Sequence, residues 1–317
     1  MELSILEPQH EPVQRLPVPP PFQDMYYWTV RNKVGESPVW DVQSQSLFWI
    51  DVRAPAVLRL CPSTCRLTRW TLPEVVGALA LTADGRLVLA LKNSLALLDC
   101  VTGELRSLNS VDTEPAGNRL NEGKVSPGGR WFVFGSMDDR PEPKRPTGAL
   151  YRTDGTGSVR CLLRGLTVAN GIAWSPDGTR IYCSDSHAGV IWQAAWQEEL
   201  GEMGHPALFA TSPEVSGRPD GALVDALGNY LSAGVSAGCL NTFDVTGRLL
   251  RRLAMPVRAP SMPCLGGEDL SRLFVTSLVR PGWDCSETLD GYLIEMAAPC
   301  VGCPPTALAY ASIRLQP

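Results

Sequence analysis

The sequence predicts an all-β fold, a six-bladed β-propeller with a central channel. The prediction depends on three observations: a repeated unit, the residues of its turns, and the apolar runs after the turns. The clearest copy of the unit is Trp174-Ser-Pro-Asp-Gly-Thr-Arg-Ile-Tyr182, a tight turn followed by a β-type run. A period of about 40–50 residues with short strands is typical of propeller blades.

The unit occurs six times, and the anchors of successive copies lie 41 to 50 residues apart. Asp-Gly and Gly-Gly pairs in the turns supply the positive φ angles that tight hairpins need. The runs after the turns are rich in Phe, Trp, Ile, Val and Leu, which suit a buried pleated sheet. Each copy is therefore expected to form one blade. The six anchors are Trp40, Leu81, Val125, Trp174, Val224 and Gly266.

Four oxygen-bearing side chains occupy one register of this repeat, four residues before the anchors. Because the innermost strands of a propeller line its channel, equivalent positions in successive blades point toward one place. Two carboxylates and two amides are typical ligands of a hard divalent cation, so the register predicts a metal site in the channel. The alternative is that these are ordinary polar residues near turns, which Asn and Asp favour. The six register positions are Glu36, Gly77, Asn121, Asn170, Asp220 and Met262.

Arg119 lies two residues before Asn121, and residues two apart in a strand share a face. Arg119 is therefore also expected at the mouth of the channel, where a guanidinium suits an anion or a polar substrate oxygen. The alternative is an ion pair between Arg119 and Glu122 or Asp138. Two explanations also stay open for Gly77, which either makes room for a ligand or simply starts a strand.

Composition argues against several classes of protein. The hydrophobic fraction of 44% is ample for a core, and the net charge of −5 gives no sign of a nucleic-acid surface. No apolar run approaches the ~18 residues of a membrane span. The N-terminus lacks a basic stretch followed by an apolar core, so no secretory signal is expected. The ten cysteines are mostly single and lie in apolar runs, which indicates the thiols of a cytoplasmic protein.

The chain is expected to divide into a Pro-rich extended arm, residues 1–24, and a propeller, residues 25–317. The β-rich run 26–30 is expected to complete the last blade beside the run 307–311. This pairing would close the ring and protect its edges. The expected oligomeric state is a monomer or a small homo-oligomer.

Two cysteine pairs and one histidine leave other chemistry open. Cys61 and Cys65 form a CxxxC pair, and Cys300 and Cys303 form a CxxC pair. These pairs are either unlinked or joined to each other as a zinc clip or a disulfide. A Ser-His-Asp site around His187 is the other alternative, although the chain has no G-x-S-x-G nucleophile elbow.

Five short motifs, in order over roughly residues 30–310, resemble the SMP-30/gluconolactonase/regucalcin family. Each motif is short, but the ordered set is quite specific. The resemblance implies a six-bladed propeller with one divalent metal in its channel, and many members hydrolyse sugar lactones. The motifs are Gly35-Glu36-Ser-Pro-Val-Trp40, Asn118-Arg119-Leu-Asn121-Glu-Gly-Lys124-Val, Asn170-Gly171 before Trp174-Ser-Pro-Asp-Gly, Pro219-Asp220-Gly221, and Gly266-Gly267 before Leu273-Phe-Val-Thr-Ser277.

Roles for individual residues also follow from this resemblance. It implies that Glu36, Asn170 and Asp220 are metal ligands, and that Arg119 and Asn121 hold a sugar-acid substrate. The register of the repeat selects four of these five residues without the resemblance.

The sequence departs from the family pattern at two places. The family usually has Asp where this chain has Glu122. A carboxylate that some members use for substrate has no clear counterpart after Gly135-Ser-Met137, and Asp138 is the candidate for that role.

Together these observations predict a metal-dependent lactonase that opens sugar lactones such as gluconolactone. A metal-bound water would attack the lactone carbonyl, with Asp220 as both metal ligand and general base. Oxygen ligands favour Ca²⁺, while Zn²⁺, Mn²⁺ and Fe²⁺ stay open. Three alternatives remain: a calcium-binding or interaction propeller without catalysis, a phosphoester or organophosphate hydrolase on the same site, and a propeller whose metal ligands are vestigial.

Overall fold

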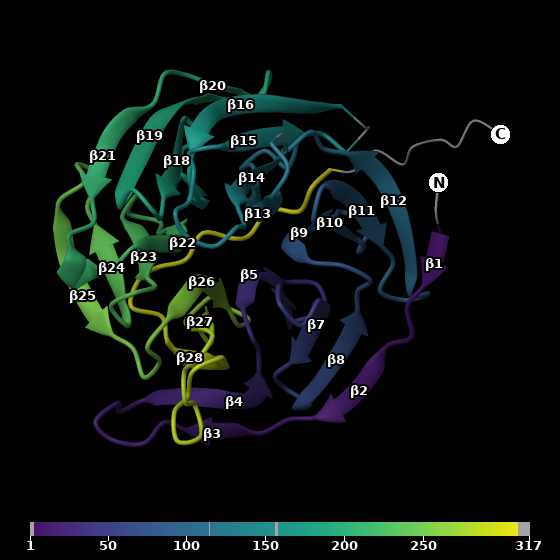
Figure 1. The fold of residues 1–317 in the computed structure, drawn as a ribbon. Helices are drawn as coiled ribbons and strands as arrows, with labels where there is room; N and C mark the ends of the chain where they lie inside the picture. Colours follow the sequence, from purple (N-terminus) through teal and green to yellow (C-terminus); the bar gives the residue numbers. More distant parts are fainter. Residues whose placement is uncertain (1–2, 114, 156–157, 310–317) are drawn as a thin grey trace.

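Six antiparallel β-sheets stand as blades around a central axis in the computed structural model, which describes residues 3–113, 115–155 and 158–309 (Figure 1). Each blade starts at the channel and continues outward, strand by strand. Blade one contains β5 (Gly35–Asp41), β6 (Ser46–Asp51), β7 (Ala56–Cys61) and β8 (Arg66–Thr71); blade two contains β9 (Val76–Leu81), β10 (Leu87–Leu91), β11 (Ser94–Leu98) and β12 (Glu104–Ser110); blade three contains β13 (Asn118–Val125), β14 (Phe132–Asp138), β15 (Gly148–Thr153) and β16 (Val159–Leu166).

The other three blades follow the same order. A short 3₁₀ helix, η1 (Glu214–Ser216), precedes blade five. Blade four contains β17 (Ala169–Trp174), β18 (Arg180–Asp185), β19 (Val190–Gln197), β20 (Glu202–Met203) and β21 (Ala207–Thr211); blade five contains β22 (Pro219–Val224), β23 (Tyr230–Gly234), β24 (Cys239–Phe243) and β25 (Leu249–Ala254); blade six contains β26 (Pro260–Gly266), β27 (Arg272–Ser277), β28 (Tyr292–Ala297) and β4 (Met25–Arg31).

The ring closes where the N-terminal strand β4 joins the C-terminal strands in blade six. β4 pairs with β28, with Tyr27 opposite Ile294. The prediction that the run 26–30 completes the last blade is therefore confirmed, but the predicted partner, the run 307–311, is wrong. Leu308 instead bridges Thr82 of blade two, and residues 310–311 lie outside the described residues.

The Pro-rich segment before β4 follows the outer rim of the propeller (Figure 1). It contains β1 (Leu3–Ile5), β2 (Gln9–Pro12) and β3 (Arg15–Pro17). Each of these strands pairs with the outermost strand of a different blade: β3 with β4, β2 with β8, and β1 with β12. The segment thus covers the exposed sheet edges of three blades, where unpaired backbone groups would otherwise be free to pair with another chain.

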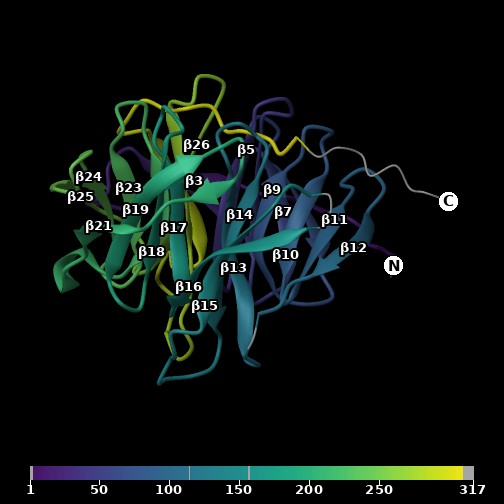
Figure 2. The same cartoon turned by 90° about the horizontal axis from the view of Figure 1, so that it is seen from above.

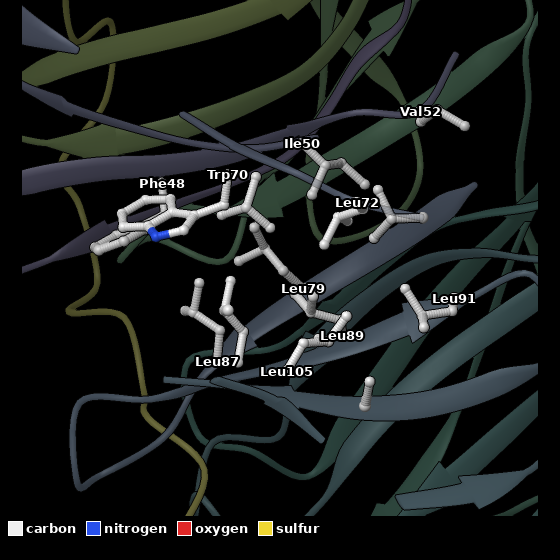
Figure 3. Close-up of a cluster of buried hydrophobic side chains, with 14 of the residues drawn as sticks. Phe48, Ile50, Val52, Trp70, Leu72, Leu79, Leu87, Leu89, Leu91 and Leu105 are labelled. Carbon is white, nitrogen blue, oxygen red and sulfur yellow. The ribbon is translucent and has the colours of Figure 1, made fainter. Parts of the chain in front are cut away.

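The hydrophobic core is divided among the contacts between neighbouring blades. Figure 3 shows the cluster between blades one and two, where Phe48, Ile50 and Trp70 meet Leu79 and Leu89. Equivalent clusters fill the other contacts around the ring. The aromatic and branched residues of the repeated β-runs supply these clusters, because alternate side chains of a strand face each neighbouring blade.

All six inner strands carry a β-bulge at the predicted register. In β13, for example, Asn121 lies opposite Gly135 and Gly123 lies opposite Phe134, so Glu122 is an extra residue. The same single insertion occurs beside Glu36, Gly77 and the register positions of blades four, five and six. A bulge redirects side chains and ends regular pairing, so one deviation repeated around the ring turns the register residues toward the channel.

The C-terminal segment, residues 298–309, crosses the end of the channel where the inner strands finish. This end is here called the lower end, although it is at the top in the view of Figure 2. Figures 1 and 2 show this yellow segment passing over the centre of the ring and along one end of the propeller. Its backbone is tied to three blades, through Val301 to Ala226, Leu308 to Leu81, and Ala309 to Gly129. No helix among the described residues is long and apolar enough to cross a membrane.

Candidate functional site

The register residues meet at the upper end of the channel, where the six inner strands begin. The inner strands contact one another in ring order, so Glu36 of blade one and Asp220 of blade five stand on either side of blade six. The register residue of blade six is Met262, and that of blade two is Gly77. A Cβ on Gly77 would lie 2.1 Å from the carbonyl oxygen of Leu120, so glycine is needed there because β9 and β13 approach closely.

Glu36 and Asp220 are acidic groups with few partners. Asp220 is 6% exposed, and Glu36 is half-buried. Burial, then the charge of Asp220, then that of Glu122, raise the pKa of Glu36 well above its usual value. Burial and the charge of Glu122 raise the pKa of Asp220 to about 8. In the described chain neither carboxylate forms an ion pair, and the main-chain N–H of Ser37 is a weak donor to Glu36 at 3.2 Å.

A chain of hydrogen bonds fixes the neutral side chains beside these carboxylates. Arg119 Nη1 donates to Asn121 Oδ1 at 2.7 Å, and Asn121 Nδ2 donates to Asn170 Oδ1 at 2.7 Å. Asn170 Nδ2 in turn donates to Ser186 Oγ at 2.7 Å. An amide oxygen has two lone pairs, so Asn170 Oδ1 keeps one acceptor position while its orientation is fixed.

The partner of Arg119 is Asp139. Arg119 Nε donates to Asp139 Oδ1 at 2.9 Å, and the same carboxylate is bound by Arg53. The sequence left an ion pair to Glu122 or Asp138 open, and the structure shows neither. Desolvation lowers the pKa of Arg119, while Asp139 acts in the opposite direction.

Asp138 lies away from the register residues. Its carboxylate accepts from Arg140 Nε at 2.8 Å and from the main-chain N–H of Arg145 at 2.9 Å. It therefore organises the 139–147 loop, and its neighbour Asp139 faces the mouth of the channel. Successive residues of a strand point to opposite sides, which explains why these adjacent acids have different surroundings.

Glu122 is the buried acid at which the sequence departs from the family pattern. It is the extra residue of the bulge in β13, with φ of 29°. Its carboxylate accepts from the main-chain N–H groups of Gly171 and Ile172, both at 2.7 Å, and so links blades three and four. Burial raises the pKa of Glu122 to about 7, and the charge of Lys124 acts against it.

The cysteine and histidine alternatives find no support in the described residues. All ten cysteines are free thiols, and no group of three or more His, Cys, Asp or Glu residues there could hold a metal. The zinc clip and the disulfide between the two cysteine pairs are therefore wrong. Asp185 caps a turn by accepting from the main-chain N–H of His187 at 3.0 Å, and His187 Nδ1 lies 3.8 Å from Glu142.

The donor set at the upper end fits a hard divalent cation. Two carboxylates and one oriented amide oxygen are oxygen ligands of the kind such cations prefer. Glu36 and Asp220 repel each other and form no ion pair with a described cation, which leaves negative charge for a metal ion to neutralise. A cation here would use only two acids from the described chain and would need amide or water oxygens to complete its ligands.

Below this site the channel is apolar and closed. A cavity of about 400 Å³ extends from Ser37 to the C-terminal residues Pro304 and Pro305. Lys124 reaches into it and donates to the carbonyl oxygen of Ala222. Desolvation lowers the pKa of Lys124, and the nearby charge of Glu122 raises it.

Comparisons with known proteins identify the family of the chain and similar folds. Residues 34–279 match the family described as SMP-30/Gluconolactonase/LRE-like region. The chain is 34% identical to the 6-deoxy-6-sulfogluconolactonase of Pseudomonas putida, over 77% of this chain and 83% of the relative. It is 32% identical to the L-arabinolactonase of Azospirillum brasilense, over 78% and 81%.

A solved structure is similar over nearly the whole fold. It is a calcium-binding protein, regucalcin, from Agrobacterium tumefaciens, with a TM-score of 0.82 and 26% identity, covering 88% of this chain and 95% of that one. The family match over residues 34–279, the identity to these relatives and the six-bladed fold lead to one conclusion. This chain belongs to the SMP-30/gluconolactonase/LRE-like family.

Proposed function

We propose that this protein is a metal-dependent lactonase that opens sugar lactones at the upper end of its channel. Glu36, Asn170 and Asp220 would hold one divalent metal ion there. The observation that carries the proposal is the pair of acids on either side of blade six, Glu36 and Asp220, which repel each other and form no ion pair among the described residues. Relatives that are named lactonases support it.

The reaction adds water to the lactone carbonyl and breaks the bond between the carbonyl carbon and the ring oxygen. A bound divalent metal supplies Lewis acidity for the carbonyl and lowers the pKa of a water molecule. Asp220 accepts a proton from the attacking water molecule while the oxygen atom of that water forms a bond to the carbonyl carbon. The bond between the carbonyl carbon and the ring oxygen breaks, and the ring oxygen takes up a proton to become a hydroxyl group. The product is a hydroxy acid, which releases one proton when its carboxyl group ionises.

Arg119 and Asn121 would bind the hydroxyl groups of the sugar and orient the ring. Arg119 is suited to this because Asp139, Leu120 and Asn121 hold its Nε and Nη1 atoms. No partner within the described residues engages its Nη2 atom, which leaves donors that face the mouth. We assign the acid that supports Arg119 to Asp139. Asp138 does not take this role, because its carboxylate is already bound by Arg140 and Arg145 of the 139–147 loop.

Ca²⁺ is the first choice of metal, because the ligands are all oxygen atoms and a similar structure is that of a calcium-binding protein. Zn²⁺, Mn²⁺ and Fe²⁺ accept the same ligands. Ten free thiols suit a reducing compartment, so we also propose a cytoplasmic location. A monomer or small homo-oligomer acting on a small-molecule lactone remains the proposed state.

The test is proton release from a panel of aldono-1,4- and 1,5-lactones, after EDTA treatment and again with each divalent ion restored. Metal-dependent release on one or more lactones is expected. If the protein binds a metal ion stoichiometrically but hydrolyses no lactone, the second candidate holds, a calcium-binding propeller without catalysis. Hydrolysis of phosphoesters or organophosphates alone would contradict the lactonase assignment.

A further inference from the structure

A long loop of blade six lies at the upper end of the channel, the end where the proposed carboxylate ligands lie. Residues 278–291 connect β27 to β28 at the upper end. The start of the loop is tied down on both sides, because Leu278 N donates to Ala259 O at 3.0 Å and Val279 N donates to Lys33 O at 2.9 Å. Lys33 lies three residues before Glu36, so the next residue of the loop, Arg280, is anchored beside the mouth of the channel.

Arg280 lines a cleft of about 760 Å³ between blades five and six. Clefts of roughly 300–1,000 Å³ are typical of small-molecule sites. The opposite wall includes Val235 and Ser236, which hydrogen-bond the backbone of Arg218, two residues before Asp220. These two walls are thus joined by hydrogen bonds to the segments that lead into the strands of Glu36 and Asp220, while Val18 and Phe22 of the N-terminal segment line a further side.

The two arginines that line this cleft differ in their partners. Arg258 is bound to Asp290 at 2.6 Å and lies 4.0 Å over the ring of Trp283. Arg280 lies 5.8 Å from the same ring, is half-buried, and forms no ion pair with any acid of the described chain, Glu287 of the cleft included. A half-buried guanidinium without a carboxylate partner is available to an anion from outside.

A divalent ion would leave Arg280 as surplus charge. The ion would neutralise Glu36 and Asp220, Lys124 lies near Glu122, and Asp139 already binds Arg119. Arg280 would then keep a positive charge that no acid of the described chain pairs with. A substrate that brings its own negative charge into the cleft would balance it.

We propose that Arg280 is a specificity residue that binds an oxyanion, so that the preferred substrates are sugar lactones with an acidic group at the end of the carbon chain away from the lactone carbonyl. This inference rests on the proposed lactonase function and names the substrate class for the same site. A carboxylate, a phosphate or a sulfonate presents the same oxygen atoms to a guanidinium. The lactone ring lies at Glu36 and Asp220, and the chain extends over blade six toward Arg280.

The experiment compares four lactones that share the glucono skeleton: glucono-1,5-lactone, its 6-phosphate, its 6-deoxy-6-sulfonate, and a glucarolactone. The three acidic lactones distinguish phosphate, sulfonate and carboxylate as the anion. At least one of them is expected to have a kcat/KM about tenfold or more above that of the neutral lactone. Arg280→Met should reduce this kcat/KM about 10- to 100-fold, mainly through KM, while hydrolysis of the neutral lactone changes less than about threefold.

Two further variants make the result specific to Arg280. Arg280→Lys retains the charge and should keep part of the preference, because lysine binds anions as a point charge without the guanidinium fork. Arg218→Met is the matched control, since Arg218 is an exposed arginine near Asp220 with no role in the proposed site. Unchanged melting temperatures, together with retained neutral-lactone activity, would show that the variants are folded.

The outcomes separate the two proposals. Equal kcat/KM on neutral and acidic lactones, or a preference that Arg218→Met removes and Arg280→Met does not, overturns the role of Arg280 and leaves the lactonase assignment intact. Absence of hydrolysis on all four lactones overturns the role of Arg280, and absence of hydrolysis on the wider panel of aldonolactones as well overturns both proposals. Calorimetric binding of the product acids gives a second readout: 6-phosphogluconate should bind more tightly than gluconate in the wild type, and the difference should disappear in Arg280→Met.

Discussion

The two ends of the central channel differ in chemistry although the same six strands build both. Strand β22 shows the difference within one element. Asp220, near its upper start, is buried, and its one hydrogen-bond donor among the described residues is the backbone of Gly221. Asp225, just past its lower end, accepts from Leu227 N, Asn229 N and Asn229 Nδ2 at 2.8–2.9 Å. A satisfied acid caps a turn, whereas an unsatisfied buried acid stores unfavourable electrostatic energy that a ligand can release.

The largest effect is expected from removing the unsatisfied acid. Asp220→Asn should lower kcat at least about 1,000-fold, because it removes both the proposed proton acceptor and one metal ligand. The metal-free variant should also melt at a higher temperature than the metal-free wild type at pH 8. Asp225→Asn is the matched control at the other end of the strand, and it should lower the melting temperature without lowering kcat. Equal kcat values for Asp220→Asn and the wild type would contradict the assignment.

A smaller effect, on stability alone, is expected at the lower end. Leu308 is fully buried and its backbone is bonded to β9. Leu308→Ala should therefore reduce the free energy of unfolding by about 2–4 kcal/mol, measured by chemical denaturation. Turnover per folded molecule should stay the same, because the C-terminal segment closes the channel far from the proposed acids. Val301→Ala, at a 65% exposed position of the same segment, should change little.

The metal-free protein should show a pH dependence that originates at the upper end. Burial and Glu122 raise the pKa of Asp220 to about 8, so the folded state binds more protons than the unfolded state at neutral pH. The contribution of Asp220 to stability should therefore fall as the pH rises from 6 to 8, by at most about 1.4 kcal/mol per pH unit. Glu36 and Glu122, whose pKa values are also raised, add to the total slope. Denaturation of the EDTA-treated protein at several pH values measures this slope. Saturating metal should reduce the slope, and Asp220→Asn should remove this contribution; an unchanged slope in the variant would assign it to other groups.

The smallest effect is expected from the two neighbouring acids at the mouth. Asp139→Asn should weaken the hold on Arg119 and raise KM about tenfold, with little change in kcat. Asp138→Asn should leave KM unchanged and lower the melting temperature, because Asp138 bonds only residues of its own loop. Steady-state kinetics and thermal melts of both variants measure this. A higher KM for Asp138→Asn alone would reverse the two assignments.

The repeat in the sequence predicts the blades well, for a physical reason. Tight turns and alternating buried strands are local features, so Ser175-Pro176-Asp177-Gly178 and its equivalents mark the same place in each blade. The spacing from turn to strand start is fixed by strand length, and it selects Glu36, Asn170 and Asp220 correctly as positions on inner strands. The pattern also predicts that β4 closes the ring, since an unpaired β-rich run must find a sheet edge.

Other features depend on contacts between segments that are distant in the sequence. The partner of β4 is β28, and the run after it crosses the channel, because residues 298–309 find backbone partners on three blades. No local pattern separates Asp138 from Asp139, since a single residue of register decides which one faces Arg119. No pattern in the sequence points to Arg280, because its proposed role in binding substrate depends on the loop that carries it over blade six.

The sequence by itself therefore determined the six blades, their order and the ring of polar positions, because turn geometry and strand periodicity are set by near neighbours. Only the tertiary structure decided which polar groups stay without partners. It satisfies Asp138, Asp225 and Glu122 through nearby backbone donors and leaves Glu36, Asp220 and Arg280 without ion-pair partners among the described residues. Whether a charge is satisfied depends on what folding brings within hydrogen-bond distance, and for Glu122 the donors come from the neighbouring blade.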